Sequence, residues 1–234
     1  MISIIIPTLN EAKYLERGLK SIKNQTSQAF EIIIVDGGSI DNTLEIAKRY
    51  TDLIVVKKSN IAQARNAGAK LAKGEVLIFL DADSAIAPNF ISKCSEILNS
   101  KKIAAVYGKM EPFEEERALK FRLLAAIGYS LLPKLSLLFR DPIFPGACIV
   151  VRKSDFEAIN GFREDLDTIE DIDLYRRLFK RGITQSDELI FSTSLRRFNA
   201  SGMYRWLFKW ITNYFYYLRT GKTSLKKEDY EIIR

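Results

Sequence analysis

The sequence predicts an α/β fold with a mostly parallel central sheet and helices on both of its faces. In the first half of the chain, short runs rich in Ile and Val alternate with segments of helical periodicity. The runs are apolar throughout, which is typical of parallel strands buried on both faces. Polar turn residues follow three of these runs, and parallel sheets bind ligands at the carboxyl ends of their strands.

Each element of the first half follows from its residues. β-Branched residues cluster in four expected strands, at 3–6, 31–35, 53–56 and 76–80. Amphipathic periodicity predicts three helices between them, at 12–24, 42–50 and 61–73. Asp41 and Ser59 are the expected N-caps of the second and third of these helices.

The second half alternates less regularly. Helices are expected at 88–99, 154–159, 171–180 and 204–218. Strands are expected at 103–110, 147–151 and 189–195. Neither half contains an internal repeat, a low-complexity segment or a linker, and 234 residues suit one well-packed domain.

The composition is ordinary for a globular protein, with 47% hydrophobic and 28% charged residues. The formal net charge of +7 favours polyanionic partners, namely phosphates, an anionic lipid surface or nucleic acid. Cys94 and Cys148 lack metal-ligand spacing and are expected to be reduced thiols of an intracellular protein. The chain has no histidine, so a general base must be a carboxylate, Lys, Tyr or Cys, and a metal site must use mainly oxygen ligands.

The sequence predicts no targeting or membrane-spanning segment. It enters a strand-like run at once, so no signal peptide is expected. Arg122, Pro133 and Lys134 interrupt the longest apolar stretch, 121–139, which therefore does not predict a spanning helix. We expect a cytoplasmic protein. The alternative is a peripheral protein on the cytoplasmic face of the membrane.

Acidic residues at the strand ends point to a binding site. Asp36 ends the second strand and is followed by Gly37 and Gly38, a pattern that equally suits a turn and helix cap. Asp81 and Asp83 follow the fourth strand, and carboxylates this close repel each other unless a cation lies between them. A hard divalent cation such as Mg²⁺ or Mn²⁺ would bridge them to substrate phosphates, and a solvated acidic turn is the alternative.

Four motifs together carry a family resemblance: SIIIPTLNE, IIIVDGGSIDNT, AQARNAGAKLAKGEVLIFLDAD and IEDIDLYRRL. In order and spacing they resemble the family 2 glycosyltransferases of the GT-A fold, from residue 2 to about residue 200. The resemblance implies an inverting transfer of a single sugar from a UDP-sugar or GDP-mannose. It also implies a catalytic domain at 1–200, divided into a nucleotide-sugar-binding half (1–110) and an acceptor half (111–200). Residues 201–234 would form an aromatic and basic helix and tail packed on the same domain.

The resemblance implies roles for the donor-site residues. The nucleotide-binding set would be Pro7, Thr8, Glu11, Asp36, Arg65 and Asp81. Within it, the first three would line the base and ribose pocket, Asp36 would contact the nucleobase edge, and Arg65 would lie near the donor. Asp83 would be the direct ligand of Mg²⁺ or Mn²⁺, with Asp81 at the ribose or the metal's water shell. Arg196 and Arg197 would bind the diphosphate by charge-assisted hydrogen bonds, although basic pairs at strand ends are as often simply solvated.

The resemblance also implies the residues on the acceptor side. Asp171 would be the catalytic base, with Glu170 supporting it or contacting the acceptor. The alternative is that Glu170, Asp171 and Asp173 are first-turn acids favoured by the helix dipole, with Arg176 and Arg177 as helical ion-pair partners. Asp173 is expected to be structural. Gly146 and Ala147 would allow close approach of the backbone to the sugar, whereas Phe156 and Phe162 are expected in the core.

Two departures from the family pattern stand out. Many relatives have a metal-binding histidine near Arg196, and its absence here makes metal dependence less secure. Arg205 and Trp206 lack the preceding glutamine of the Q-x-x-R-W motif found in processive enzymes, which favours transfer of a single sugar.

The segment MYRWLFKWITNYFYYLRTGKTSLKK, from Met203, combines aromatic rings with Lys and Arg and suits the headgroup zone of a bilayer. The Leu-rich region 119–139 is a second such candidate. Either segment could instead pack as core or form a homodimer contact. If they are interfacial, the acceptor would be a lipid phosphate or lipid-linked saccharide, as in the polyprenyl-phosphate sugar transferases that the chain resembles.

Other classes of function are open from the residues alone. A nucleotidyltransferase would share the sheet and the acidic metal site, but it usually carries a Gly-rich phosphate loop that PTLNE does not supply. A non-catalytic nucleotide-sugar or membrane-surface binding protein on this fold would not need both acidic pairs. Nucleic acid is not expected as a partner, because the basic residues are spread out and no recognised motif appears.

Overall fold

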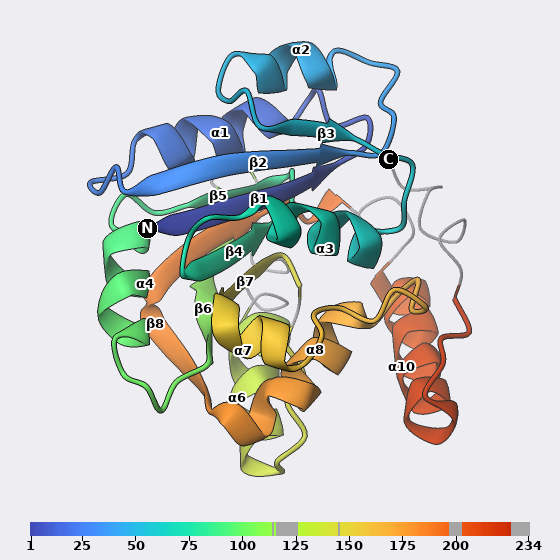
Figure 1. The fold of residues 1–234 in the computed structure, drawn as a ribbon. Coiled ribbons are helices and arrows are strands. Elements are labelled where there is room, and N and C mark those ends of the chain that lie inside the picture. The colour runs from blue at the N-terminus through green and yellow to red at the C-terminus, as the bar shows by residue number, and fades with distance from the viewer. Residues whose placement is uncertain (114, 116–125, 145, 197–202, 226–234) are drawn as a thin grey trace.

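The chain forms one eight-stranded sheet with helices against both of its faces, as Figure 1 shows for the computed structural model. The structure describes residues 1–113, 115, 126–144, 146–196 and 203–225. The strands are β1 (Ile2–Thr8), β2 (Phe30–Asp36), β3 (Ile54–Val56), β4 (Val76–Leu80), β5 (Ser84–Ile86), β6 (Ala105–Met110), β7 (Cys148–Arg152) and β8 (Ile183–Thr193). They lie in the order β3-β2-β1-β4-β7-β6-β8-β5.

The helices surround this sheet. They are α1 (Leu15–Lys23), α2 (Thr43–Lys48), α3 (Ile61–Leu71), α4 (Phe90–Leu98), α6 (Leu132–Leu138), α7 (Lys153–Ala158), α8 (Glu170–Leu178) and α10 (Met203–Thr220), together with the π-helix η2 (Ala126–Leu131) and the 3₁₀ turn η3 (Phe179–Arg181). Within the described ranges, none of these helices has the length and apolarity needed to cross a bilayer.

The α/β fold predicted from the sequence is confirmed. β1 pairs in parallel with β2 and with β4, and β2 pairs in parallel with β3, as the alternation of strands and helices predicts. The other half of the sheet is mixed. β7 runs antiparallel to β4 and β6, β8 is parallel to β6, and β5 is antiparallel to β8.

Three local predictions were wrong or incomplete, and one strand was missed. The N-cap of α3 is Asn60 and not Ser59, because the Asn60 side chain and Gln63 form a reciprocal capping box. Asn42 precedes α2, although Asp41 does accept a hydrogen bond from the Thr43 amide. β8 begins six residues before the strand predicted at 189–195, because ITQSDE is too polar to signal a strand. β5 was missed because three residues carry no periodicity.

Helix α3 lies close against the parallel strands. A Cβ at Gly68 would collide with the side chain of Ile5 on β1 and crowd Val35 on β2. The absent side chain therefore lets the helix axis approach the sheet. Arg65, one turn earlier on α3, is carried to the carboxyl edge of the sheet by the same approach.

The antiparallel strands bring the second half of the chain to the carboxyl edge of the sheet. Leu80 of β4 pairs with Cys148 of β7, so the Asp81 amide donates a hydrogen bond to the Ala147 carbonyl at 2.9 Å. Ser84 of β5 pairs with Thr193 of β8 in the same manner. Segments more than 60 residues apart in sequence therefore meet next to the two aspartates.

Candidate active site

The site begins where β1 and β2 end in register. Thr8 lies opposite Asp36, and the buried Asp36 carboxylate accepts hydrogen bonds from the Thr8 and Ser39 hydroxyls at 2.8 and 2.6 Å. Its other oxygen accepts from the amides of Gly38 and Ser39 at 2.9 and 2.7 Å. These four bonds use the acceptor positions of the carboxylate. A contact of Asp36 with a nucleobase stays a prediction, and it would replace one of these four hydrogen bonds.

Arg65 lies at the centre of the site, with only 1% of its surface exposed. Its Nη1 donates to Glu170 Oε1 at 2.9 Å, and its Nη2 donates to Asp81 Oδ1 at 2.9 Å and to the Gly146 carbonyl at 3.0 Å. The guanidinium also lies over the ring of Phe162, 5.3 Å from its centroid. One buried cation thus joins the end of β4, the segment before β7 and the start of α8.

The buried charges shift each other's pKa values. Burial alone would lower the pKa of Arg65, but the carboxyl groups of Asp81, Glu170 and Asp171 raise it above its ordinary value. Burial, reinforced by the neighbouring Asp171, raises the pKa of Glu170 to about 8 even though Arg65 acts in the opposite direction. Glu170 is therefore held inside the cluster by Arg65, which favours a supporting role over direct contact with the acceptor.

Asp171 is half-buried and more open than Glu170. Its Oδ1 accepts a hydrogen bond from the Ile172 amide at 2.8 Å, and a Cβ at Gly146 would come within 2.6 Å of its Oδ2. Only glycine at position 146 leaves room for this carboxyl group. Burial raises the pKa of Asp171, while Arg65 partly offsets that effect, and a raised pKa is suited to a carboxylate that takes up a proton near neutral pH.

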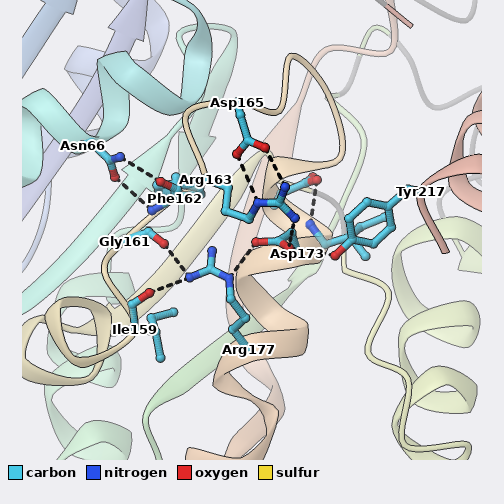
Figure 2. Close-up of polar contacts among 11 residues, drawn as sticks. Asn66, Ile159, Gly161, Phe162, Arg163, Asp165, Asp173, Arg177 and Tyr217 are labelled. Carbon is cyan, nitrogen blue, oxygen red and sulfur yellow. Dashed lines mark hydrogen bonds and ion pairs between the residues drawn. The ribbon is translucent and has the colours of Figure 1, made fainter. Parts of the chain in front are cut away.

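Helix α3 also holds the loop that leads into α8. The Asn66 side chain donates to the Phe162 carbonyl and accepts from the Phe162 amide, both at 2.9 Å, as Figure 2 shows. Ile169, the last residue before α8, has a φ of 64°, a left-handed conformation that is unfavourable for a β-branched side chain. Its burial with Tyr214 and Tyr217 offsets that cost, and the turn places Glu170 and Asp171 at the helix start.

A second cluster forms around Arg196. Its Nη2 donates to both carboxylate oxygens of Glu11, at 2.7 and 2.9 Å, and lies 3.1 Å from Asp83 Oδ2. The guanidinium stacks over Tyr14, 4.3 Å from the ring centroid. Its Nε is buried and has no hydrogen-bond partner in the described part of the chain. Strand pairing explains the contact, because the Ser194 amide donates to the Asp83 carbonyl and Arg196 follows two residues later.

The donor set fits a divalent cation only when substrate supplies further ligands. Over the described ranges, no group of three His, Cys, Asp or Glu side chains could hold a metal ion. Mg²⁺ commonly binds through one or two carboxylates and completes its shell with water and substrate phosphates. Asp83, with Asp81 beside it, suits that arrangement. The Arg196 guanidinium now lies against Asp83, so it would have to withdraw from the carboxylate for a cation to bind there.

The excess of acidic groups at the site favours the binding of a divalent cation. Six carboxyl groups and two guanidinium groups converge at this edge of the sheet: Glu11, Asp36, Asp81, Asp83, Glu170, Asp171, Arg65 and Arg196. A diphosphate entering such a region meets excess negative charge. A divalent cation that arrives with it would offset the repulsion.

Most of the predicted site residues converge, in two clusters joined by the Asp81–Asp83 loop. The Arg65 cluster contains Asp81, Gly146, Ala147, Glu170 and Asp171, and the Arg196 cluster contains Glu11 and Asp83. Pro7 is half-buried beside Thr8, whereas Arg197 lies outside the described residues. Their individual roles in binding and catalysis stay predictions.

Sequence reasoning missed three supporting residues. Tyr14 lies beneath Arg196. The Thr43 hydroxyl accepts a hydrogen bond from the Glu11 amide at 2.8 Å, and the Ser39 hydroxyl donates one to Asp36. Ser39 and Thr43 carried a signal, since both belong to the motif IIIVDGGSIDNT, whereas Tyr14 lies outside the four motifs. Among the alternatives, Arg177 does pair with Asp173 at 2.6 Å, but Arg176 pairs with Asp141 outside the helix. Phe156 and Phe162 are buried in the core, as predicted.

This arrangement agrees with comparisons to known proteins. Residues 3–159 match the family described as Glycosyl transferase family 2. The match covers more than half of the chain, which therefore belongs to that family, as its motifs imply. An uncharacterized glycosyltransferase of Rickettsia conorii is 31% identical over 208 residues, covering 83% of this chain and 34% of the relative. The chain thus spans about a third of the length of that curated relative.

Solved structures agree in fold. TarS 1-349 of S. aureus in complex with UDP-GlcNAc has a TM-score of 0.64 at 20% identity, covering 82% of this chain and 58% of that one. The mannosyltransferase PcManGT from Pyrobaculum calidifontis, in complex with GDP-Man and Mn²⁺, has a TM-score of 0.66 at 20% identity, covering 88% and 59%. These neighbours confirm the GT-A fold that the motifs imply.

The raised pKa of Glu170 predicts a pH dependence of stability. Its folded pKa of about 8 lies above the unfolded value of roughly 4.3, so the native state binds this proton more tightly. The contribution of protonated Glu170 to the free energy of unfolding is complete below the unfolded pKa and is lost as the pH rises through the folded pKa. The free energy of unfolding of the wild type should therefore fall relative to that of Glu170→Gln between about pH 5 and pH 9.

Urea denaturation of both proteins across this pH range measures the difference. The exposed Glu157→Gln variant is the control, and its curve should run parallel to that of the wild type. Parallel curves for the wild type and Glu170→Gln would contradict the assignment.

Proposed function

We propose that this chain is an inverting glycosyltransferase. It would move one sugar from a UDP-sugar or GDP-mannose to an acceptor hydroxyl or a lipid phosphate, assisted by Mg²⁺ or Mn²⁺. A lipid-linked acceptor would place it on the cytoplasmic face of a membrane as a peripheral protein. Family membership supports the reaction class, and TarS and PcManGT, solved with UDP-GlcNAc and GDP-Man, support the choice of donors.

The observation that carries this proposal is the pair of 2.9 Å contacts through which Arg65 joins Asp81 to Glu170. Asp81 belongs to the acidic pair suited to a metal-bound diphosphate, and Glu170 adjoins the candidate base. A protein that only bound nucleotide sugars would need the first group but would have no use for a half-buried carboxylate beside it. The shared guanidinium holds the two groups at one site.

In this reaction, Asp171 would take the proton of an acceptor hydroxyl as its oxygen attacks the anomeric carbon. The new carbon–oxygen bond forms while the bond from the anomeric carbon to the diphosphate breaks, and the nucleoside diphosphate leaves with that electron pair. Attack from the face opposite the leaving group inverts the configuration. A phosphate acceptor would already carry an ionised oxygen at neutral pH, so it would depend less on Asp171.

Residues of this chain would also stabilise the departing nucleoside diphosphate. Asp83, with Asp81 beside it, would hold Mg²⁺ or Mn²⁺, which when bound supplies positive charge to the departing diphosphate. Arg196 would turn its guanidinium from Asp83 toward the diphosphate. Its contacts with Glu11 and Asp83 all use Nη2, and its Nε lacks a partner in the described part of the chain, so the side chain has donor capacity for phosphate oxygens.

The donor is identified by calorimetric titration of UDP-sugars and GDP-sugars, with and without Mn²⁺. We expect one nucleobase to be preferred, and we expect Asp83→Ala to weaken that binding by about tenfold or more, because the metal loses its protein ligand. The remote Asp155→Ala variant is the control. If no donor bound under any condition, the proposed activity would be wrong.

Removing the candidate base should separate binding from chemistry. We expect Asp171→Asn to lower transfer of the sugar to water or to a hydroxyl acceptor by about 10²–10⁴-fold. Its affinity for the donor should stay within about twofold, because Asp171 would act on the acceptor. Release of nucleoside diphosphate measures the rate, and calorimetry measures the affinity. An unchanged rate with hydroxyl acceptors would rule Asp171 out as the base.

Arg196 should compete with metal for Asp83. Without donor, we expect Arg196→Gln to bind Mn²⁺ about fivefold more tightly than the wild type, because a positive charge beside the ligand is removed. The same variant should bind donor more weakly. Electron paramagnetic resonance of free Mn²⁺ measures the first effect without any turnover. Arg49→Gln, which removes an exposed cation elsewhere, is the control, and equal Mn²⁺ affinity of all three proteins would contradict this role.

A further inference from the structure

Helix α10 is fixed to the rest of the protein by the polar groups of its inner face. Asn213 donates to the Thr168 hydroxyl at 2.9 Å, Tyr214 to Asp141 at 2.8 Å and Tyr217 to Asp173 at 2.7 Å. Figure 2 shows the last of these contacts, with Asp173 also bound to Arg177. Burial and the bond to Asp173 raise the pKa of Tyr217 to about 12, so its hydroxyl remains a donor at neutral pH. The orientation of the helix is thereby set.

The outer face of α10 is apolar and exposed. Phe208 is 70% exposed, Ile211 39%, Phe215 60% and Leu218 40%. Their spacing of three, four and three residues places them in one stripe along the helix. Tyr216 beside them is 43% exposed. Large apolar side chains gathered in this way, on a helix whose other face is pinned, mark an interaction surface.

A second exposed apolar group lies on α6. Leu135 at 42%, Leu138 at 74% and Phe139 at 76% exposure belong to α6 and its C-terminal end. The chain continues from Phe139 to Asp141, which accepts the hydrogen bond from Tyr214 in the middle of α10. The C-terminal end of α6 is therefore tied to the inner face of α10 through Asp141.

The charges of these two segments select the partner. Residues 126–140 and 203–220 contain no Asp or Glu, whereas they carry five Lys or Arg residues, of which Lys134 pairs with Asp187 at 3.3 Å. Two copies of such a surface would repel each other, since cations would face cations. An anionic bilayer instead attracts the cations and accepts the apolar side chains, the combination typical of helices that lie in the membrane interface.

We infer that the outer face of α10 and the C-terminal end of α6 dock on the surface of an anionic bilayer. Phe208, Phe215 and Phe139 enter the boundary between headgroups and acyl chains, while Lys209, Arg219 and Arg140 contact the anionic headgroups. No spanning helix is needed for this mode of binding.

Docking has a consequence for the active site. Tyr217 on α10 holds Asp173 of α8, and the first turn of α8 carries Glu170 and Asp171. Bilayer contact therefore fixes the height of the candidate base above the membrane, which suits an acceptor whose reactive oxygen lies at the lipid surface. This consequence rests on the proposed function, whereas the docking surface itself does not.

Sedimentation of the full chain with large unilamellar vesicles tests the inference, using phosphatidylcholine alone or with phosphatidylglycerol. We expect binding to the anionic vesicles that weakens as salt is raised. The double variant Phe208→Ser/Phe215→Ser should lose about tenfold or more of that affinity. Leu53→Ser/Leu71→Ser, which removes two exposed apolar side chains at a distance, should bind like the wild type. Lys209→Gln/Arg219→Gln should lose binding to anionic vesicles specifically.

Three outcomes would overturn the inference. The first is equal vesicle binding by the wild type and the double Phe variant. The second is a wild type that fails to bind vesicles although the same preparation binds a nucleotide sugar. The third is a wild-type dimer that the double Phe variant converts to a monomer without any vesicle binding, which would identify a second copy as the partner. Vesicle binding without donor binding would support the docking surface and count against the proposed activity alone.

Discussion

The buried guanidinium of Arg65 is the constraint on which the site depends. A cation with 1% exposure is tolerated only when charged partners compensate for its lost hydration. Its partners come from the end of β4 and the start of α8, which lie 16 and 105 residues away in sequence. Removing one member would leave another charge buried without a partner, and this is costly. The end of β4 and the start of α8 are therefore coupled through one side chain.

The antiparallel strands explain why the site is compact. Parallel strands alone would bring Thr8, Asp36 and Asp81 to one edge, but every one of these residues belongs to the first half of the chain. The return of β7 beside β4 adds Gly146, and the missing side chain at that position leaves room for Asp171. The pairing of β5 with β8 adds Arg196 in the same way. Register in the sheet thus determines which charges meet.

The sequence predicted most of the locally encoded elements, although not the N-caps of α2 and α3, and it missed what depends on distant pairing. Apolar runs identified β1, β2, β3 and β4, and the family resemblance named the charged residues of both clusters but not Tyr14. The contact of Arg196 with Asp83 could not be read from either segment, because it follows from a strand pairing 109 residues apart. The early start of β8 was hidden for a similar reason, since its polar residues form a strand only because β6 supplies the hydrogen-bonding partner.

The charge distribution links the site to the rest of the surface. The chain carries a net charge of +7, yet carboxyl groups outnumber guanidinium groups at the candidate site among the residues described. The basic excess must therefore lie elsewhere, and 126–140 and 203–220 hold part of it without a single acid. A diphosphate donor with its own divalent cation suits the acidic edge, whereas a polyanionic surface suits the basic segments. The opposite signs would allow the protein to bind both at once, with α10 and α8 joined between them by the hydrogen bond from Tyr217 to Asp173.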